Sequence, residues 1–386
     1  MAPKPDFDVA IAGAGIIGAS VAWHLCRAGL RVAVIDAVGP AAAASGASDG
    51  AVSVASKKPG LMARLASGSL QYSRALAVGG VLEGAFSFRP AYVFGSGAVE
   101  LDALDALVAM LGSLAGPVRV VKDGHATLLP GLGEQVDRLV VLDGEGHMPG
   151  HKAVRAYLAT PGVTPIWPAQ IVGIEADAVG VTLNLGARQL RVSYLVAALG
   201  VSTPTLFPGM PILPRAGQLI VTDRGPRGAL PGALTAAAYL VAKTASGASL
   251  PRPPVVIDPL ATGQYLIGSS REDHSDISRV DFATLRLLLS RASAAWPALR
   301  DRRVIRAFAG VRAAVPDGLP IVGPLPDAPR VIMATGFEGD GICLSALIGR
   351  EVALMARGEA PQAEWATDLA ALSPARFTAL RREGAA

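Results

Sequence analysis

Short apolar runs separated by glycines open the chain and predict a strand, a helix and a second strand. Residues 8–12 (DVAIA) are mostly apolar, which is typical of a buried strand. Residues 19–29 (ASVAWHLCRAG) carry apolar side chains at helical spacing and end at a glycine, a common helix terminator. The apolar run at 31–36 (RVAVID) then predicts another strand. A strand–helix–strand unit is therefore expected at the start.

Two later parts of the chain repeat these signals. Residues 169–202 contain short alternating runs that close on a buried strand and a glycine at YLVAALG. Residues 330–336 (RVIMATG) predict another strand, which is followed by a glycine-rich turn and an apolar, helix-like stretch. We therefore expect one domain to be assembled from three separated pieces of the sequence.

The composition fits a turn-rich globular enzyme with two domains. A chain of 386 residues exceeds the usual size of one hydrophobic core. Hydrophobic residues make up 51% and charged residues 17%, with 44 Gly and 29 Pro, which excludes a disordered or coiled-coil chain. The net charge of +4 is modest, arginines are scattered and 5% of residues are aromatic, so we expect no nucleic-acid partner.

The cysteines and the hydropathy of the chain bear on its location. Cys26 and Cys343 belong to no Cys-x-x-Cys motif, which predicts reduced thiols, a cytoplasmic protein and no metal site. The apolar run near the N-terminus is interrupted by glycines and followed by a charged helix, unlike a signal peptide. No segment supplies the roughly 20 uninterrupted apolar residues of a membrane span. We expect no integral membrane segment, and peripheral attachment to a membrane stays open.

A glycine motif between the first strand and helix predicts dinucleotide binding. The turn GAGIIG, residues 13–18, has the G-x-G-x-x-G spacing. Gly13 permits the turn, Gly15 lets a pyrophosphate approach the backbone, and Gly18 lets the helix pack on the strand. Asp36 ends the second strand roughly 20 positions later, where it can accept hydrogen bonds from a ribose. The motif fits NAD and FAD equally, and a glycine-rich turn without a ligand is the remaining alternative.

Five segments carry a resemblance to a known family. They are GAGIIGASVAWHLCRAGLRVAVID (13–36), SGASDGAVS (45–53), LVAALGVS (195–202), FAGVRAAVPDGLPIVGP (308–324) and ATGFEGDGI (334–342). In this order and spacing they resemble the D-amino-acid-oxidase-like family of FAD-dependent amine oxidoreductases, which includes glycine oxidase and sarcosine oxidase. SDGAVSVASKKPG (48–60) and YLIGSSRED (265–273) further resemble the β subunits of opine oxidase, D-hydroxyproline dehydrogenase and hydrogen cyanide synthase.

The resemblance implies an α/β (α+β) fold in which a Rossmann-like FAD-binding domain is interleaved with a mixed-sheet substrate domain. The FAD-binding domain would take residues 1–80, 148–212 and 306–386, and the substrate-binding domain would take 81–147 and 213–305. Strand-like runs in the second domain agree with a sheet: GQLIVTD (217–223), AAAYLVAK (236–243), PPVVIDP (253–259) and GQYLIGSS (263–270). Residues 281–296 predict one helix, and the insertion-like run 243–256 predicts either a mobile loop or an assembly surface.

The resemblance also implies hydride transfer from a substrate carbon to flavin N5, and this chemistry needs a cation for the substrate carboxylate. Arg312, in AGVRAAVPDG, matches the family arginine that holds this carboxylate, and a guanidinium suits a planar carboxylate. Arg271, directly after GSS, is a second candidate for the cavity or the flavin edge; a solvated loop is its alternative. Tyr239 lies on a strand-like run where its hydroxyl could line the amine site; core packing is its alternative.

The residues expected to contact FAD come mainly from the five segments, with Val172 added near the adenine. They are Gly13, Gly15, Ile16, Ile17, Gly18, Asp36, Ser45, Ser48, Asp49, Gly50, Val172, Gly200, Gly336, Phe337, Gly339, Gly341 and Ile342. The hydroxyls of Ser45 and Ser48 suit the phosphate or ribitol of FAD. Backbone amides of the turn at 336–341 suit the pyrimidine edge of the flavin.

Two acids stand in this glycine-rich turn, where a helix start normally favours an anion. Family members often carry histidine at the position of Phe337 and an apolar or small residue at that of Asp340, so the chain departs from the family at both. Our hypothesis is that Glu338 and Asp340 face a partner subunit or the solvent. Lys57 and Lys58 follow the 45–53 loop and could approach the flavin or the pocket mouth, although lysines after a loop are usually solvated.

These inferences predict an FAD-dependent oxidoreductase acting on the C–N bond of a small amino acid or N-substituted amino acid. D-amino acids, glycine, sarcosine, D-hydroxyproline and opines are the candidate substrates, and the imine product would then be hydrolysed. The subgroup resemblance implies that electrons pass to partner subunits of a hetero-oligomer rather than to oxygen. An NAD-linked dehydrogenase and an FAD-holding structural subunit without turnover are the alternatives.

Overall fold

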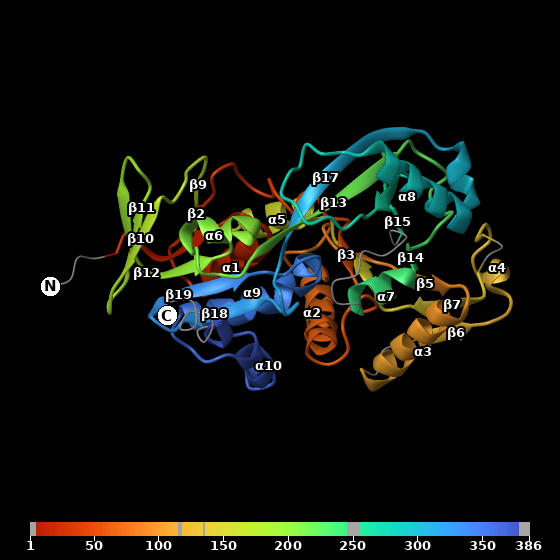
Figure 1. The fold of residues 1–386 in the computed structure, drawn as a ribbon. Helices are drawn as coiled ribbons and strands as arrows, with labels where there is room; N and C mark the ends of the chain where they lie inside the picture. Colours follow the sequence, from red (N-terminus) through yellow and green to blue (C-terminus); the bar gives the residue numbers. More distant parts are fainter. Residues whose placement is uncertain (1–4, 115–117, 134–135, 245–254, 378–386) are drawn as a thin grey trace, which may run out of the picture.

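Strands from distant parts of the chain pair in two eight-stranded sheets within residues 5–114, 118–133, 136–244 and 255–377, which this computed structural model describes (Figure 1). The first sheet has the order β10-β11-β12-β1-β2-β9, with β19 paired to β12 and β18 paired to β19. Its strands are β1 (Phe7–Ala12), β2 (Val32–Ile35), β9 (Val163–Ile166), β10 (Gly173–Ala176), β11 (Val181–Asn184), β12 (Gln189–Ala197), β18 (Ile321–Leu325) and β19 (Ala328–Thr335).

The centre of this sheet is parallel. β1 pairs with β2 and β12 in parallel, and β12 pairs with β19 in parallel. All residues of β2 are buried, as expected for a parallel strand covered on both faces. Parallel pairing places the carboxyl ends of β1, β2, β12 and β19 at one edge, where ligands bind in open α/β sheets.

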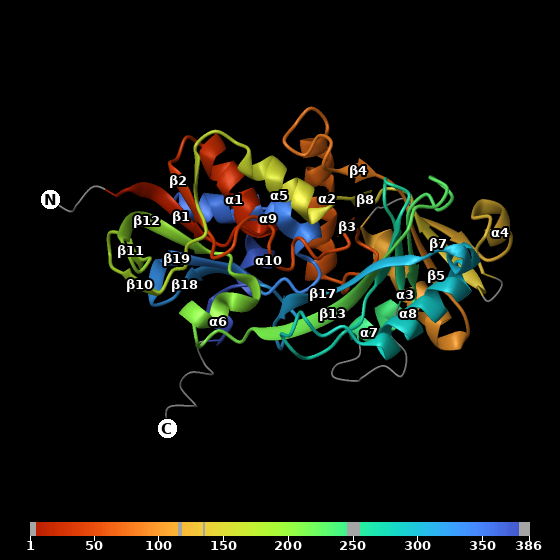
Figure 2. The same cartoon turned by 90° about the horizontal axis from the view of Figure 1, so that it is seen from above.

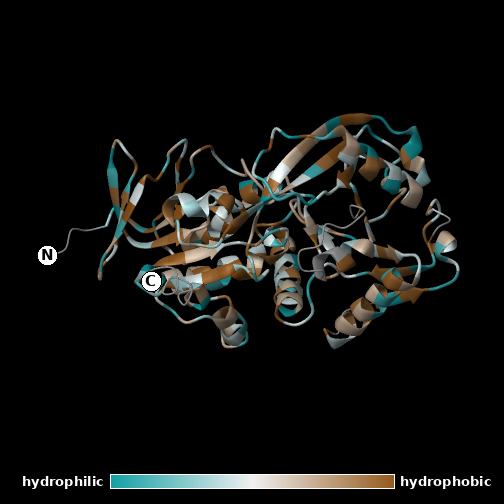
Figure 3. Cartoon of the chain, viewed as in Figure 1, coloured by the Kyte–Doolittle hydropathy of each residue, from teal (hydrophilic) through white to brown (hydrophobic). Residues whose placement is uncertain are grey.

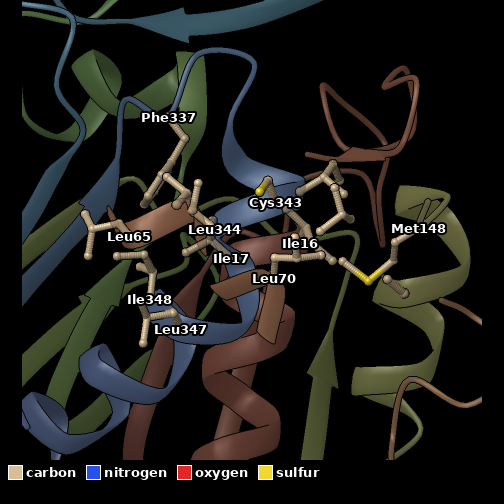
Figure 4. Packing of buried hydrophobic residues seen from close by; sticks show 14 of the residues in the cluster. Ile16, Ile17, Leu65, Leu70, Met148, Phe337, Cys343, Leu344, Leu347 and Ile348 are labelled. Carbon is tan, nitrogen blue, oxygen red and sulfur yellow. The ribbon is translucent and has the colours of Figure 1, made fainter. Parts of the chain in front are cut away.

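Four helices pack together beside the first sheet: α1 (Ile16–Arg27), α2 (Leu61–Ala77), α5 (Gly150–Leu158) and α9 (Gly341–Ala356). α1 and α9 lie side by side although they are far apart in sequence (Figure 2). Figure 4 shows part of their shared core, in which Ile17 lies beside Leu344, and Ile16, Leu347 and Ile348 belong to the same buried cluster. Burying each such side chain stabilises the fold by about 1.5–3 kcal/mol, so this core fixes the start of α1 against the start of α9.

The second sheet has the order β17-β13-β16-β15-β14-β5-β7-β6. Its strands are β5 (Ala91–Gly95), β6 (Val118–Val121), β7 (Arg138–Leu142), β13 (Leu213–Thr222), β14 (Ala233–Ala236), β15 (Val256–Pro259), β16 (Tyr265–Gly268) and β17 (Val304–Ala314). Neighbouring strands are antiparallel except β5 and β14. β17 pairs with β13 along nearly its whole length, although the expected domain division assigns residues from 306 to the FAD-binding part.

Alternation along β5 explains how the second sheet is covered on both faces. Tyr92 and Phe94 share a buried cluster with Trp296 and with helix α8 (Phe282–Ala295), whereas Val93 shares the other cluster with helix α3 (Ala98–Ser113). Successive strand residues point to opposite faces, so one strand serves two helical layers. Figure 3 shows hydrophobic residues concentrated along these inner strands.

The remaining elements are short. A three-stranded sheet joins β3 (Ala51–Val52), β8 (Gly146–His147) and β4 (Ser87–Phe88). The other helices are α4 (His125–Leu128), α6 (Thr203–Leu206), α7 (Ala238–Thr244), α10 (Ala366–Ala371) and the 3₁₀ turns η1 (Gly200–Ser202), η2 (Pro297–Asp301) and η3 (Pro374–Phe377). Within the described ranges, no helix has both the length and the apolar character needed to cross a bilayer.

Most of the expected elements are confirmed, and one is wrong. The helix expected at 281–296 is α8, and its N-cap Asp281 accepts a hydrogen bond from the Thr284 amide at 2.8 Å. The run 236–243 is not one strand, because β14 ends at Ala236 and α7 begins at Ala238. Alanine, leucine and lysine in that run favour helix, and the strand pattern concealed this preference. Of the insertion-like run, residues 245–254 lie outside the described part of the chain.

Candidate active site

A groove at the carboxyl edge of the first sheet begins at the turn between β1 and α1. Gly13 has a φ of +108°, and a Cβ there would lie 2.4 Å from the Ala198 carbonyl oxygen. A Cβ on Gly18 would lie 2.1 Å from the Gly13 carbonyl oxygen, so Gly18 lets α1 approach the strand closely. Gly15 is the N-cap of α1 and lines the groove. The helix start therefore faces the groove with the positive end of its dipole, which suits a pyrophosphate.

Asp36 follows β2 at the same edge of the sheet and lines the groove. Its Oδ2 accepts the Ala14 amide at 2.8 Å, and its Oδ1 accepts the amides of Val38 at 2.9 Å and Gly39 at 2.8 Å. These three bonds hold the carboxylate in one orientation. Each carboxylate oxygen can accept further hydrogen bonds, as a ribose would require.

The loop after β2 contributes hydroxyl groups. Ser45 Oγ accepts the Ile16 amide at 3.0 Å and lines the groove, so its own proton is available to a phosphate oxygen. Ser48 Oγ donates to the Ser45 carbonyl at 3.0 Å. Ser48 and Asp49 line a second cavity, which adjoins the groove and is also lined by Arg312. Gly50 lies beside His147 and is not among the residues that line either space.

The turn after β19 closes the other end of the groove. Gly336 has a φ of +77°, and a Cβ there would lie 2.4 Å from Val315 Cγ2. The Glu338 amide donates to the Ala313 carbonyl at 2.8 Å, which anchors the turn to β17. Phe337 lines the groove, Gly339 and Ile342 line the adjoining cavity, and Gly341 lines both spaces.

The expected orientation of the two acids is wrong. Asp340 is buried, and its Oδ1 pairs with Lys57 Nζ at 2.8 Å. Glu338 pairs with Arg271 and, at 3.2 Å, with Arg215. Lys57, expected to be solvated, is 7% exposed, whereas Lys58 is exposed as expected. These partners lie 67 to 283 positions away in the chain, so no local pattern could indicate them.

Arg312 lines the adjoining cavity. Its Nη2 donates to Ser269 Oγ at 2.6 Å and to the Ser270 carbonyl at 3.1 Å. Its Nη1 is buried and has no hydrogen-bond partner among the described residues. Burial lowers the pKa of Arg312, but an arginine side chain stays charged at physiological pH. A buried, charged donor therefore remains for an anion in the cavity.

The other two predicted catalytic residues lie at different depths. Tyr239 lines the Arg312 cavity from α7 rather than from a strand. Arg271 is not among the residues that line this cavity; it lies behind Glu338, which does line it. Arg271 therefore orients Glu338 instead of meeting a ligand in this arrangement.

Two predicted FAD contacts lie at the groove margins. Gly200 lines the groove, and its carbonyl accepts Thr203 Oγ1 at 2.7 Å. Val172 does not line the groove: it is exposed, and its amide donates to the Asn184 carbonyl at 2.8 Å. The neighbouring residues 169–171 line the groove instead. The segment near the groove was predictable from sequence, but the residues of it that line the groove were not.

Sequence reasoning missed residues that shape the arginine cavity. Gly217 on β13 lies so close to Arg312 that a Cβ would be 2.3 Å from its Nη2. Ser269 and Ser270 follow β16 and hold the guanidinium, and their only signal in the sequence was the GSS run before Arg271. Pairing of β13 with both β16 and β17 brings these segments together.

The groove and the arginine cavity form a continuous site. Ile16, Ser45, Glu338 and Gly341 line both of them. The groove offers a helix start, a carboxylate and glycine turns, and the cavity offers a buried guanidinium. This donor set fits a dinucleotide bound in the groove.

Comparisons with known proteins identify the family. Residues 8–355 match the family described as DAO, FAD dependent oxidoreductase, so the chain belongs to this family. It is 28% identical over 97% of its length to the tRNA 5-methylaminomethyl-2-thiouridine biosynthesis bifunctional protein MnmC of Maricaulis maris, of which it spans 56%. It is 25% identical to a subunit of the opine oxidase of Rhizobium meliloti, over 98% of this chain and 100% of that one.

A solved structure agrees with the fold. The crystal structure of glycine oxidase from Geobacillus kaustophilus has a TM-score of 0.83 with this chain at 22% identity, over 96% of this chain and 98% of that one. The expected α/β fold and the expected family are thereby confirmed. The protein is an FAD-dependent oxidoreductase, which sets aside the NAD-linked and purely structural alternatives. FAD, when bound, supplies the acceptor for a hydride.

Proposed function

We propose that this protein oxidises the C–N bond of a small amino acid or N-substituted amino acid, with Arg312 holding the substrate carboxylate. The observation that carries this proposal is the buried Arg312, whose Nη1 has no partner within the described residues. A buried cationic donor without a partner is costly, and a carboxylate would satisfy it in a charge-assisted pair. Its cavity adjoins the FAD groove, so a carboxylate held there places the neighbouring carbon beside the cofactor.

In the proposed reaction, the residues of this chain bind and orient the substrate. A substrate carbon next to nitrogen gives up a hydride, which bound FAD would accept, nitrogen gives up a proton to solvent, and a C=N bond forms. Water then adds to this imine and releases a carbonyl compound together with ammonia, or with an amine when the substrate is N-substituted. In this scheme Arg312 fixes the carboxylate and Tyr239 borders the amine from α7. Glu338, held by Arg271 and Arg215, presents negative charge to the same cavity and favours a substrate that carries an ammonium group.

The names of similar proteins support this substrate class. One similar chain is an opine oxidase subunit, and a similar solved structure is a glycine oxidase. The FAD contacts proposed above and the division into an FAD-binding and a substrate-binding domain belong to the same proposal. The two large sheets support that division, with β17 placed in the substrate-binding part.

We further propose that a partner subunit accepts the electrons. The opine oxidase chain of Rhizobium meliloti is by its name one subunit of an assembly, and it is similar to this chain from end to end.

Cys26 and Cys343 are free thiols, which accords with the predicted cytoplasmic location.

The direct test is an anaerobic absorbance titration of the FAD-loaded protein. Glycine, sarcosine, D-proline, D-hydroxyproline and opines are added in turn, and bleaching of the flavin band reports oxidation. Air is then admitted; slow return of the band supports a protein acceptor, and rapid return contradicts it. No bleaching by any of these amino compounds contradicts the proposed substrate class.

Arg312→Met gives the matched test of the arginine. We expect retained FAD but a loss of substrate affinity of about 3 kcal/mol, or roughly a hundredfold, because a charge-assisted pair is lost. The control is Arg306→Met, which alters an exposed arginine on the same strand, β17. Equal substrate affinity in the Arg312→Met and Arg306→Met variants would refute the role of Arg312.

A further inference from the structure

A buried ion pair lies behind the turn at 336–341. Lys57 Nζ and Asp340 Oδ1 are 2.8 Å apart, with side chains 4% and 11% exposed. Lys57 also donates to Ser56 Oγ at 3.3 Å. The two residues come from the loop after β3 and from the residue that precedes α9. The pair therefore ties the loop after β3 to the turn that borders the active site.

The position of Asp340 relates this pair to the cofactor. Asp340 lies between Gly339 and Gly341, which both line the arginine cavity, yet Asp340 does not line it. Its carbonyl accepts the Leu344 amide at 3.0 Å in the first turn of α9. The side chain thus turns away from the cavity, and its charge lies one residue behind the surface that the flavin would contact.

Lys57 approaches the pair from the opposite side. It lines a separate, mostly apolar pocket with Met110 of α3 and Leu240 of α7. Burial by itself would lower the pKa of Lys57, but Asp340 opposes this and the net result is a raised pKa. Lys57 therefore keeps its positive charge, which lies 2.8 Å from the Asp340 carboxyl group beside the cofactor groove.

Stability alone is a poor reason for such a pair. Removing two charges from water costs several kcal/mol for each ion, and buried pairs are often no more stabilising than apolar residues of similar size. Asp340 also stands at a helix start, where a lone carboxylate would compete with a reduced flavin for the same positive field. A neutral pair removes that competition.

We propose that Lys57 and Asp340 are positioning residues: their ion pair holds the 336–341 turn against the flavin, and their charge balance sets the reduction potential of bound FAD. This rests on FAD in the groove and is independent of the substrate. Asp340→Asn leaves the positive charge of Lys57 uncompensated, which stabilises reduced, anionic flavin and raises the potential. Lys57→Met leaves the negative charge of Asp340, which lowers the potential.

The test is a double-mutant cycle with FAD affinity, reduction potential and melting temperature measured for each variant. We expect the single changes to shift the potential in opposite directions. Each should change the ratio of affinities for reduced and oxidised FAD about tenfold, which corresponds to about 30 mV for a two-electron couple. The reduction potential of the double variant Lys57→Met/Asp340→Asn should differ from that of the parent protein by less than a third of either single shift. Lys58→Met, which alters the exposed neighbouring lysine, should change neither potential nor affinity.

Each outcome decides the proposal. Lower melting temperatures with unchanged potentials, or shifts of the same sign, would show a purely structural pair and overturn it. If a single variant cannot hold FAD, recovery of binding in the double variant supports the proposal, and failure to recover it overturns the proposal. Substrate turnover is not used, so a wrong substrate assignment leaves this test intact.

Discussion

The position of the Arg312 guanidinium depends on Gly217 having no Cβ atom. Gly217 gives the guanidinium its space on β13, while Ser269 and Ser270 hold it from β16. Arg312 was predictable because it lies in a recognisable segment. Gly217 was not, because its role follows only from the pairing of β13 with β17.

Gly217→Ala should weaken substrate binding without removing FAD. A Cβ would lie 2.3 Å from Arg312 Nη2, which forces the guanidinium away from its serine partners. We expect KM to rise roughly tenfold or more, the equivalent of at least about 1.4 kcal/mol. The control is Gly173→Ala on β10, where the nearest atom to a Cβ would be 3.7 Å away. Unchanged KM in Gly217→Ala would show that the guanidinium has room to move.

At the scale of elements, the sequence predicts a helix or strand well where the apolar residues of that element follow a clear local period. The strand–turn–helix at the start, the 281–296 helix and the strands around 169–202 all carry a local period, and the structure confirms them. The 236–243 run failed because its apolar residues suit a strand and a helix alike. Contacts between elements, such as those of Lys57 and Glu338, lie beyond any local pattern.

Glu145, just before β8, ties that strand to the loop after β3. Its Oε2 accepts the Val54 amide at 2.9 Å. Burial raises the pKa of this carboxyl to about 7, against hydrogen bonds from Ser53 and Val54 that lower it. Because the folded pKa lies above the ordinary 4.5, the contribution of this group to stability is present below pH 4.5 and is lost as pH rises through 7.

Glu145→Gln should therefore flatten the fall of stability with rising pH. The loss avoided between pH 5 and pH 8 is about 3 kcal/mol or less, because the pKa of Glu145 rises from 4.5 to about 7. Urea unfolding at both pH values measures it, with Glu83→Gln as the exposed control. A fall of the same size in parent and Glu145→Gln would contradict the assignment of Glu145.

At the scale of the whole molecule, the FAD groove gathers segments from across the chain. It is lined by the first turn, the end of β2, residues 198–206 and the turn at 336–341. The order of these segments was visible in the sequence, which is why the fold and the cofactor could be predicted. The shape of the arginine cavity could not be predicted, because this cavity forms only where segments of the two sheets meet.

FAD should stabilise the whole chain, since its groove exists only in the folded state. Saturation at a thousand times Kd adds about 4 kcal/mol, so the melting temperature of stripped protein should rise by several degrees on adding FAD. Asp36→Ala should reduce this rise, because the carboxylate that would meet the ribose is gone. NAD serves as the control ligand. A melting temperature indifferent to FAD would contradict the groove assignment.

The parallel pairing of β12 with both β1 and β19 also has a consequence for biosynthesis. Residues 7–12 can pair early with residues 32–35 on one side, but their partner on the other side, residues 192–197, is made much later, and β12 waits further for residues 331–333. Such distant pairings close long loops and slow folding. A nascent chain therefore emerges with β1 paired on one side at most, and the FAD groove is incomplete until the turn that begins at Gly336 has been made.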